Sequence, residues 1–155
     1  MRFIFLFPGR TSEKFLEEGI SDYAARLGRF VKVEIVVLRD RGAKSLPPEQ
    51  FRQQEARQLL ERCAHASCVV ALDSGGIALD SPALAELLSR WEDAGHRIVH
   101  FLIGGHLGLH EDVLRRADVV LSLSRLTFTH EMARLILLEQ LYRSCMIKAG
   151  RSYHN

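Results

Sequence analysis

Three short segments of the chain combine glycine, hydroxyl and apolar residues in a way that could hold a small ligand. They cover residues 73–76 (Asp-Ser-Gly-Gly), 104–108 (Gly-Gly-His-Leu-Gly) and 122–129 (Ser-Leu-Ser-Arg-Leu-Thr-Phe-Thr). The glycines of the second segment would let the backbone approach a ligand closely, because no side chain intervenes. This segment matches neither a dinucleotide-binding fingerprint nor a P-loop, and a tight turn without any ligand would use the same glycines.

The third segment is apolar for an exposed loop, since it carries Leu126 and Phe128. A flat aromatic ligand such as adenine could lie against these two side chains. Ser124, Thr127 and the start of the following helix would then satisfy its polar edges. The alternative is a loop that packs on the core and whose hydroxyl groups cap the next helix.

Signatures of other catalytic classes are missing from the sequence. It has no serine-nucleophile elbow, no cysteine–histidine signature and no carboxylates placed for glycoside hydrolysis. His106 and His110 have a spacing that binds metal on a helix, but Gly108 interrupts the segment, so we expect no metal. The composition favours a protein that binds a cofactor carrying its own reactive group.

Strand and helix patterns alternate along the chain, and the strands and helices that they predict must position the three segments. We expect Thr11 or Ser12 to cap the first helix and Ser81 to cap the third. The alternation predicts one α/β domain over residues 1–155, with a mostly parallel sheet and helices on both faces; its ligands would bind at the carboxyl ends of the strands. The predicted strands are 2–7, 31–38, 68–72, 98–103 and 118–121, and the predicted helices are 12–27, 47–64, 81–94, 110–117 and 130–148.

Length and composition are those of a globular protein, with 155 residues of which 47% are hydrophobic and 26% charged. We recognise no spanning segment, no signal peptide and no disulfide or zinc spacing among the three cysteines, and therefore expect a cytoplasmic protein. The net charge of +2 is too low for a dedicated nucleic-acid coat. Residues 125–155 nevertheless carry five basic and two acidic side chains, which could contact phosphates or merely solvate a helix face.

The segment 130–148 departs from a simple amphipathic pattern, because apolar residues cover most of its circumference. Such a helix is buried on more than one side. The sheet can cover one side, and a second subunit is the simplest cover for the other, so we expect a two-fold homodimer. A tightly packed monomer is the alternative.

Several sequence motifs occur in an order typical of one protein family. They are Val-Ala-Leu-Asp at 70–73, Ile-Gly-Gly at 103–105 with Gly-Leu at 108–109, Leu-Ser-Leu-Ser at 121–124 leading to Thr127-Phe128 and His130, Glu-Gln-Leu-Tyr-Arg at 139–143 and Tyr-His at 153–154. The chain resembles the RlmH (YbeA) family of bacterial SPOUT-class methyltransferases over essentially its whole length. It departs from the family pattern where Thr129 replaces the usual proline and where His106 and Leu107 stand between the glycines.

The resemblance implies a homodimer whose C-terminal part forms a trefoil knot that binds S-adenosyl-L-methionine. It implies methylation of N3 of a pseudouridine in a 23S rRNA stem-loop on the assembled ribosome. From the residues themselves we expect neither a metal nor a membrane partner. Another RNA acceptor such as tRNA, or a ribosome-associated module without turnover, stays open as an alternative. The cofactor-binding residues that the resemblance implies are Leu72, Gly104, Leu123, Ser124, Arg125, Leu126, Thr127 and Phe128.

The C-terminal end offers candidates for the methyl-transfer step itself. The N3 proton has a pKa well above neutral, so a base or a cationic stabiliser of the anion would help. Position and residue type make His154 the candidate base and Arg151 and Arg143 the candidate stabilisers, while Tyr153 could stack on a base. The alternative for the tail is plain disorder.

Overall fold

The computed structural model describes residues 1–39, 45–63 and 67–150, and its centre is a five-stranded, entirely parallel sheet. The strands form where the sequence has nearly continuous apolar runs, as expected of strands buried on both faces. The strand order is β2-β1-β4-β3-β5. The strands are β1 (Arg2–Pro8), β2 (Lys32–Leu38), β3 (Cys68–Ala78), β4 (Ile98–Ile103) and β5 (Val119–Ser122).

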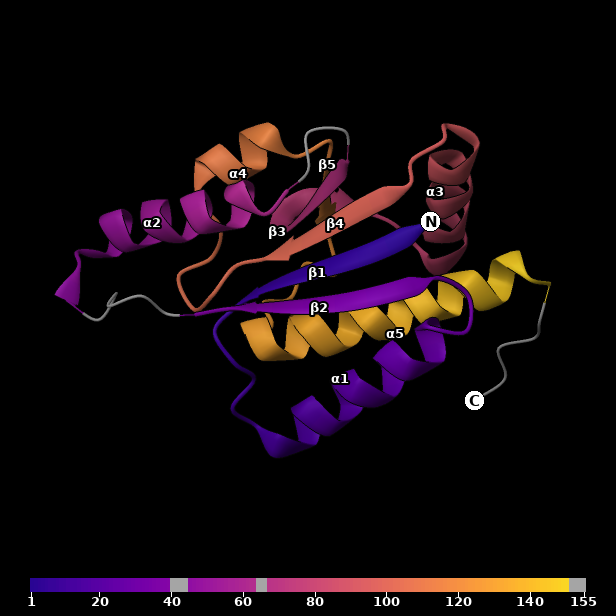
Figure 1. Ribbon diagram of the computed structural model, residues 1–155, viewed down its shortest axis with the longest axis horizontal. Helices are drawn as coiled ribbons and strands as arrows, with labels where there is room; N and C mark the ends of the chain where they lie inside the picture. Colours follow the sequence, from indigo (N-terminus) through magenta and orange to yellow (C-terminus); the bar gives the residue numbers. More distant parts are fainter. Residues whose placement is uncertain (40–44, 64–66, 151–155) are drawn as a thin grey trace.

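Helices cover both faces of this sheet, which confirms the predicted α/β class (Figure 1). Two hydrophobic clusters, one on each face, hold the helices in place. The helices of one face are α1 (Lys14–Leu27), α3 (Ser81–Asp93) and α5 (His130–Lys148), and those of the other are α2 (Pro48–Glu61) and α4 (Glu111–Arg116). No helix of the described part is long and apolar enough to cross a membrane.

The larger cluster is built around aromatic side chains of β1 and β4. Phe5 stacks on Phe101 with ring centroids 5.1 Å apart, and Phe3 meets Phe101 edge-on at 5.2 Å. Trp91 of α3 approaches the same ring. Such pairs add to the free energy gained by burial alone, so this cluster fixes α3 on the sheet.

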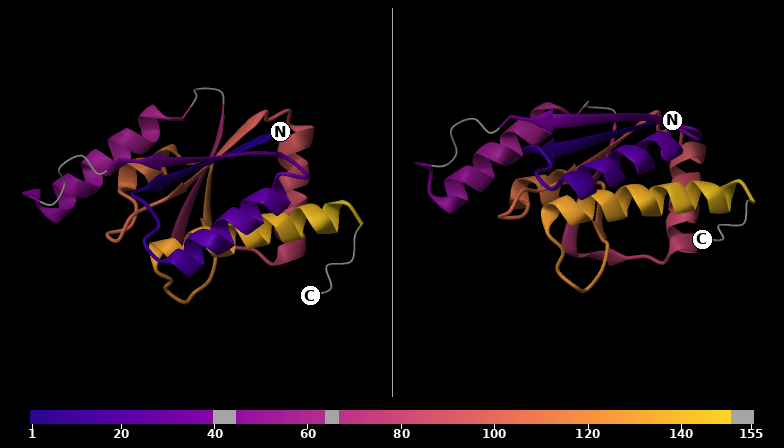
Figure 2. Two further views of the ribbon diagram at one scale, coloured as in Figure 1. Left: turned by 60° about the horizontal axis from the view of Figure 1, so that its bottom comes forward. Right: turned by 90° about the horizontal axis from the view of Figure 1, so that it is seen from below.

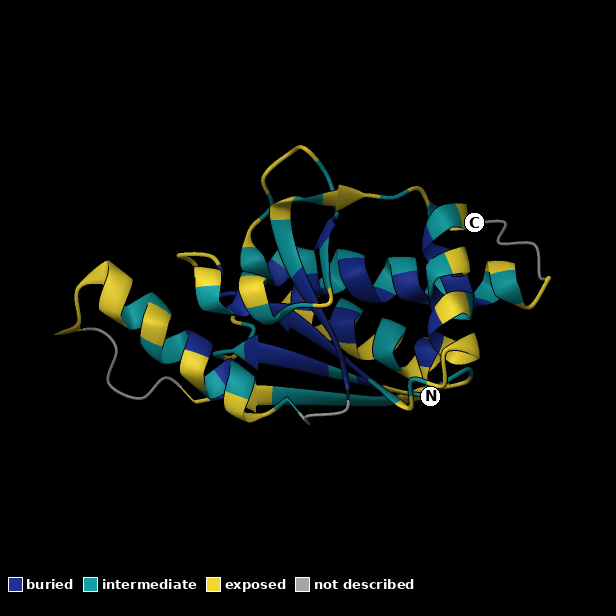
Figure 3. Cartoon of the chain, turned by 90° about the horizontal axis from the view of Figure 1, so that it is seen from above, coloured by how far each residue is buried: buried dark blue, intermediate teal, exposed yellow. Residues whose placement is uncertain are grey.

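The last helix, α5, is covered largely by its own chain. It runs beside α1 beneath the strands (Figure 2), and α3 contacts it as well. These neighbours account for much of the apolar circumference that the sequence pattern assigned to a second subunit. Figure 3 shows few exposed residues on α5, but a stripe of Met132, Ile136, Glu139 and Arg143 remains partly exposed.

The two predicted helix caps are wrong, because the serines concerned bind distant partners. Ser12 gives both its backbone N–H and its hydroxyl to Glu131 at 2.8 Å, and α1 starts after Glu13 without a side-chain cap. In α3 the cap is Asp80, whose carboxylate accepts the N–H of Ala83, while the hydroxyl of Ser81 donates to Gln140.

Strand β3 is longer than predicted. Residues 73–76, expected to be a turn, form an irregular stretch after which Ile77 pairs again with Leu121 of β5. Gly76 passes so close to β5 that a Cβ there would lie 2.5 Å from the carbonyl oxygen of Val120. Gly76, one of the two glycines that suggested a turn, therefore permits a close approach between strands.

Candidate functional site

The three segments identified in the sequence converge on one cavity of about 520 Å³ at the carboxyl ends of the strands. This is where ligands bind in open parallel sheets. Arg125 is exposed and does not line the cavity. The other seven predicted cofactor residues line it: Leu72, Gly104, Leu123, Ser124, Leu126, Thr127 and Phe128.

Gly104 lies where residues 104–108, called the glycine loop from here on, fold back on themselves. A Cβ at Gly104 would lie 2.7 Å from the carbonyl carbon of Gly108 and 2.8 Å from the backbone nitrogen of Leu109. The loop is closed by a bond from the Gly108 N–H to the Gly105 carbonyl at 3.0 Å, and Gly108 has a φ of +74°. Only glycine fits this path, which brings bare backbone to the cavity wall.

The segment 122–129 uses its hydroxyl groups to hold its own shape. Ser124 accepts the N–H of Leu126 at 2.9 Å, and Thr129 caps α5 by accepting the N–H of Met132 at 3.2 Å. Helix capping by this segment, one of our two alternatives, is thus present. Leu123 packs against the core, but Leu126 farther along the segment is 73% exposed, and this exposed apolar residue favours a ligand contact.

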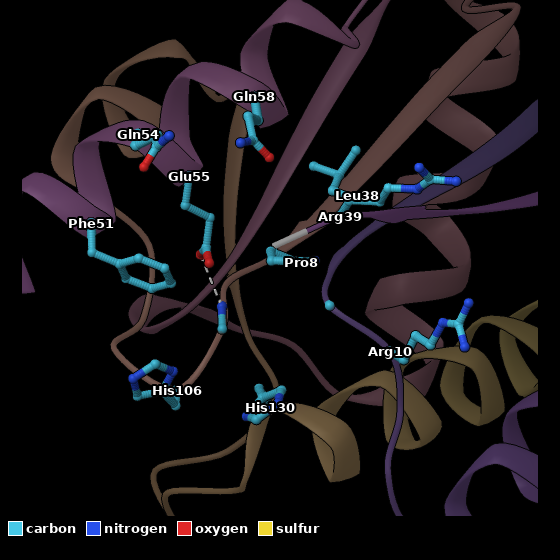
Figure 4. A pocket seen from close by; sticks show the side chains of 12 residues that line it. Pro8, Arg10, Leu38, Arg39, Phe51, Gln54, Glu55, Gln58, His106 and His130 are labelled. Carbon is cyan, nitrogen blue, oxygen red and sulfur yellow. Dashed lines mark hydrogen bonds between the residues drawn. The ribbon is translucent and has the colours of Figure 1, made fainter. Parts of the chain in front are cut away.

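A second, smaller cavity of about 200 Å³ adjoins the first (Figure 4). It lies between the end of β1, helix α2 and the glycine loop, and both cavities share Gly105, His106 and His130. No motif in the sequence pointed to this cavity. Its α2 residues, among them Phe51 and Glu55, follow an ordinary amphipathic pattern, which gave no signal of a site.

Two buried charged residues of α5 hold the segment 8–13 against the cavities. The Glu131 carboxylate accepts the N–H and hydroxyl of Ser12 at 2.8 Å each and the N–H of Glu13 at 3.1 Å. Burial alone would raise the pKa of Glu131, but these three hydrogen bonds outweigh it, so its pKa lies below the usual value. The carboxylate therefore stays charged and keeps α1 attached to the start of α5.

Arg134 is fully buried on the same helix and anchors the end of β1. It donates to the Thr11 hydroxyl at 3.0 Å and to the Pro8 carbonyl at 2.8 Å. Its guanidinium lies 4.7 Å from the centre of the Phe7 ring, which provides a cation–π contact. The backbone that passes over the smaller cavity is thereby fixed to α5.

His130 stands in the wall between the two cavities, at the first residue of α5. Burial lowers the pKa of His130, and the neighbouring positive charge of Arg134 lowers it further. The imidazole is consequently neutral near pH 7. A neutral ring can donate and accept hydrogen bonds without adding positive charge to the wall.

Helix α2 is tied to the glycine loop by three polar contacts. Arg52 donates to the Leu109 carbonyl at 2.7 Å, and Glu49 lies 3.0 Å from the ring nitrogen Nε2 of His110. Glu55 accepts the Gly105 N–H at 3.0 Å. The position of α2 and the shape of the loop are thus linked.

The histidines considered for a metal have other roles. His110 caps α4 by accepting the N–H of Asp112 at 3.1 Å, and the ring of His106 lies 5.6 Å from that of Phe51. Within residues 1–39, 45–63 and 67–150, no three histidine, cysteine or acidic side chains are grouped to hold a metal ion.

The structure does not bring Arg143 to the cavities of its own chain. Arg143 lies on α5 about 20 Å from His130 at 1.5 Å per residue, where it donates to Glu139. The remaining candidates for the transfer step, Arg151, Tyr153 and His154, lie outside the described residues.

Two solved structures that share this fold are named as a methylase or a methyltransferase. A probable methylase family protein from Haemophilus influenzae Rd KW20 has a TM-score of 0.55 at 11% identity, over 99% of this chain and 70% of that chain. A probable methyltransferase from Bordetella pertussis Tohama I has a TM-score of 0.53 at 16% identity, over 93% and 95%. At these identities the likeness shows a common fold.

Relatives of higher identity define the family. The Ribosomal RNA large subunit methyltransferase H of Desulfotalea psychrophila is 44% identical over 154 residues, 99% of each chain. The protein of the same name from Syntrophotalea carbinolica is 43% identical over 155 residues, 100% of this chain and 99% of the relative. The family described as Predicted SPOUT methyltransferase matches residues 1–154. The chain belongs to this family, as its motifs suggested.

Membership of this family makes the chain a SPOUT-class methyltransferase whose methyl donor is S-adenosyl-L-methionine. The trefoil knot is implied by the family and not by the strand order alone.

Proposed function

We propose that this chain methylates N3 of a pseudouridine in a 23S rRNA stem-loop on the assembled cytoplasmic ribosome. The observation that carries the proposal is the convergence of the three strand-end segments on one cavity. The names of the relatives, which specify the large ribosomal subunit RNA, support the acceptor.

The larger cavity suits the methyl donor in size and in chemistry. About 520 Å³ falls within the range of pockets for cofactor-sized ligands. Leu126 and Phe128 would contact the adenine ring, and the bare backbone at Gly104 leaves room that a Cβ would fill. When bound, the cofactor supplies a methyl group on a positively charged sulfur, and the neutral His130 does not repel that charge.

The tail of one chain and Arg143 of its helix α5 would complete the site of a second chain, because Arg143 does not reach the cavities of its own chain. His154 would accept the N3 proton as N3 takes the methyl group, Arg151 and Arg143 would stabilise negative charge on the base, and Tyr153 would stack on a neighbouring base. The electron pair of the broken carbon–sulfur bond stays on sulfur, so charge and atoms balance.

The length of α5 favours a tail supplied by a second subunit. From His130 to Lys148 the helix measures about 27 Å. The six residues from there to His154 span at most about 22 Å when fully extended. A tail would have to run straight back along its own helix to approach its own cavities, whereas a partner packed on α5 could deliver its tail directly.

The surface for that partner is the stripe of Met132, Ile136, Glu139 and Arg143 on α5. These side chains lie one helical turn apart and remain partly exposed. We propose that two chains pair along this stripe with two-fold symmetry.

The proposal is tested with ribosomes that lack the modification. Purified protein and S-adenosyl-L-methionine with a labelled methyl group are incubated with such ribosomes, with isolated 23S rRNA and with tRNA, and the product is located by mass spectrometry. We expect label on one pseudouridine of the ribosome and little on the free RNAs. Preferential labelling of tRNA would show that tRNA, and not 23S rRNA, is the methyl acceptor. Cofactor binding without labelling of any RNA would favour a non-catalytic module.

A further inference from the structure

We infer that the smaller cavity receives the acceptor base and that Glu55 reads the ring N–H by which pseudouridine differs from uridine. This inference rests on the proposed function and deepens it, because it assigns the substrate subsite and a specificity-determining residue. It is built from the size of the cavity, its position beside the cofactor cavity and the chemistry of its walls.

Size and position separate the roles of the two cavities. The smaller one, about 200 Å³, has room for a single planar base but not for a cofactor-sized ligand. It shares the wall formed by Gly105, His106 and His130 with the larger cavity. Methyl transfer requires the reacting atoms to come within about 3–3.5 Å, and two adjoining cavities allow that approach.

Aromatic rings form one side of the smaller cavity. The rings of Phe51 and His106 lie with their centres 5.6 Å apart, and Figure 4 shows both at the same side of the space. A base that has left its helix is commonly held by stacking on such rings. Phe51 lines only the smaller cavity, so it reports on this subsite alone.

Glu55 enters the cavity from α2, opposite His130 (Figure 4). One carboxylate oxygen accepts the Gly105 N–H at 3.0 Å, and the other lies 3.0 Å from the place of a Cβ on Gly105. The carboxylate is thus fixed at the junction of α2 and the glycine loop. The oxygens of a carboxylate can each accept more than one hydrogen bond, so Glu55 favours ligands that present N–H groups.

Pseudouridine presents such a group where uridine does not. In uridine N1 carries the sugar, which leaves N3–H as the only ring N–H. In pseudouridine the sugar is on carbon, so both N1–H and N3–H are present on either side of the C2 carbonyl. With N3 turned toward the methyl donor, N1–H remains for Glu55. A site built to bond such a group discriminates strongly against the analogue that lacks it.

Two arginines at the edge of the cavity suit the phosphates of a nucleotide. Arg10 and Arg39 are exposed and lie on the side away from Phe51 (Figure 4). They can contact backbone phosphates, which fix the register of an RNA without reading its sequence.

A binding experiment tests the subsite without relying on turnover. The ring signals of ¹³C-labelled histidines are followed by NMR in the cofactor-free protein during titration with pseudouridine 5′-monophosphate, uridine 5′-monophosphate or inorganic phosphate. We expect His106 and His130 to shift with the pseudouridine nucleotide, at least about threefold more tightly than with the uridine nucleotide. Equal affinity for both nucleotides, or the same shifts with phosphate alone, would overturn the inference.

Variants of α2 provide a second test of the subsite. Phe51→Ala and Glu55→Gln are compared with Gln53→Ala, which changes an exposed residue of the same helix. Phe51→Ala should raise KM for the ribosome at least about tenfold and leave the Kd of S-adenosyl-L-methionine within about twofold. Glu55→Gln should narrow the preference for pseudouridine over uridine, and Gln53→Ala should match the wild type. Wild-type values in Phe51→Ala and Glu55→Gln would contradict the subsite, whereas a wild type that labels no ribosome contradicts only the proposed function.

Discussion

Glu131 couples the start of α1 to the start of α5 through three hydrogen bonds to one buried carboxylate. Glu131→Gln replaces a charged acceptor by a neutral one. We expect a loss of about 1–3 kcal/mol in the free energy of unfolding at pH 7. Urea unfolding measures this, with the exposed Glu17→Gln of α1 as the matched control. Equal stability of the two variants would show that the contact adds nothing.

The same carboxylate makes stability depend on pH. Because the pKa of Glu131 is lower in the folded chain than its usual 4.5, its contribution is complete above that value and is lost as the pH falls through the folded pKa. As the pH falls below 5, the free energy of unfolding of the wild type should therefore decrease more than that of Glu131→Gln. Parallel pH profiles of the two proteins would contradict this assignment.

His154 is the proposed acceptor of the N3 proton, and a change at His154 should affect methyl transfer without affecting cofactor binding. His154→Ala should lower kcat about a hundredfold or more, while the Kd of S-adenosyl-L-methionine stays near that of the wild type. Single-turnover kinetics and calorimetry measure the two quantities. An equal loss of both would remove His154 from the transfer step.

At the level of single residues, the sequence was informative where glycine and hydroxyl residues follow strands. Gly104 and Phe128 were predicted to be near one another because strand ends share one edge of a parallel sheet. Leu72 was implied by the family resemblance, and all three residues line one cavity. Phe51 and Glu55 could not be found in this way. Their chemistry depends on where a helix packs, and nothing in the amphipathic pattern of α2 distinguishes them.

At the level of elements, α2 and the glycine loop form one unit through Arg52, Glu49 and Glu55. Arg52→Met keeps the aliphatic stem but leaves the Leu109 carbonyl without this donor. We expect faster amide hydrogen exchange in residues 104–110 and a roughly threefold to tenfold weaker affinity for the methyl donor. Arg57→Met, exposed on the same helix, is the control, and unchanged exchange in Arg52→Met would refute the link.

The elements themselves were predicted well, and their ends less well. Helix α5 and strand β4 begin and end where the pattern placed them. Strand β4 is a nearly continuous apolar run, and α5 is capped by the adjacent residue Thr129. The start of α1 and the length of β3 were predicted incorrectly. Ser12 binds a residue 119 positions away, and β3 resumes its pairing with β5 after residues 73–76. Such partners are set by tertiary packing and leave no local signal.

At the scale of the whole molecule, the proposed active unit contains two chains. Light scattering after size exclusion should give the mass of a dimer. Ile136→Lys, which places a charge in the partly exposed stripe of α5, should give a monomer that still binds S-adenosyl-L-methionine but no longer methylates ribosomes. Val37→Lys on the edge strand β2 controls for an added surface charge. A monomeric wild type with full activity would contradict the shared site.

The most direct test of the account is a calorimetric titration of the protein with S-adenosyl-L-methionine, repeated on Gly104→Val. At Gly104 even a Cβ would lie 2.7 Å from backbone atoms of the loop, so valine must open the glycine loop that forms the cavity wall. We predict saturable binding at one site per chain in the wild type and its loss in the variant, with the circular dichroism spectrum retained. Equal binding by both proteins would place the methyl donor elsewhere and contradict the account.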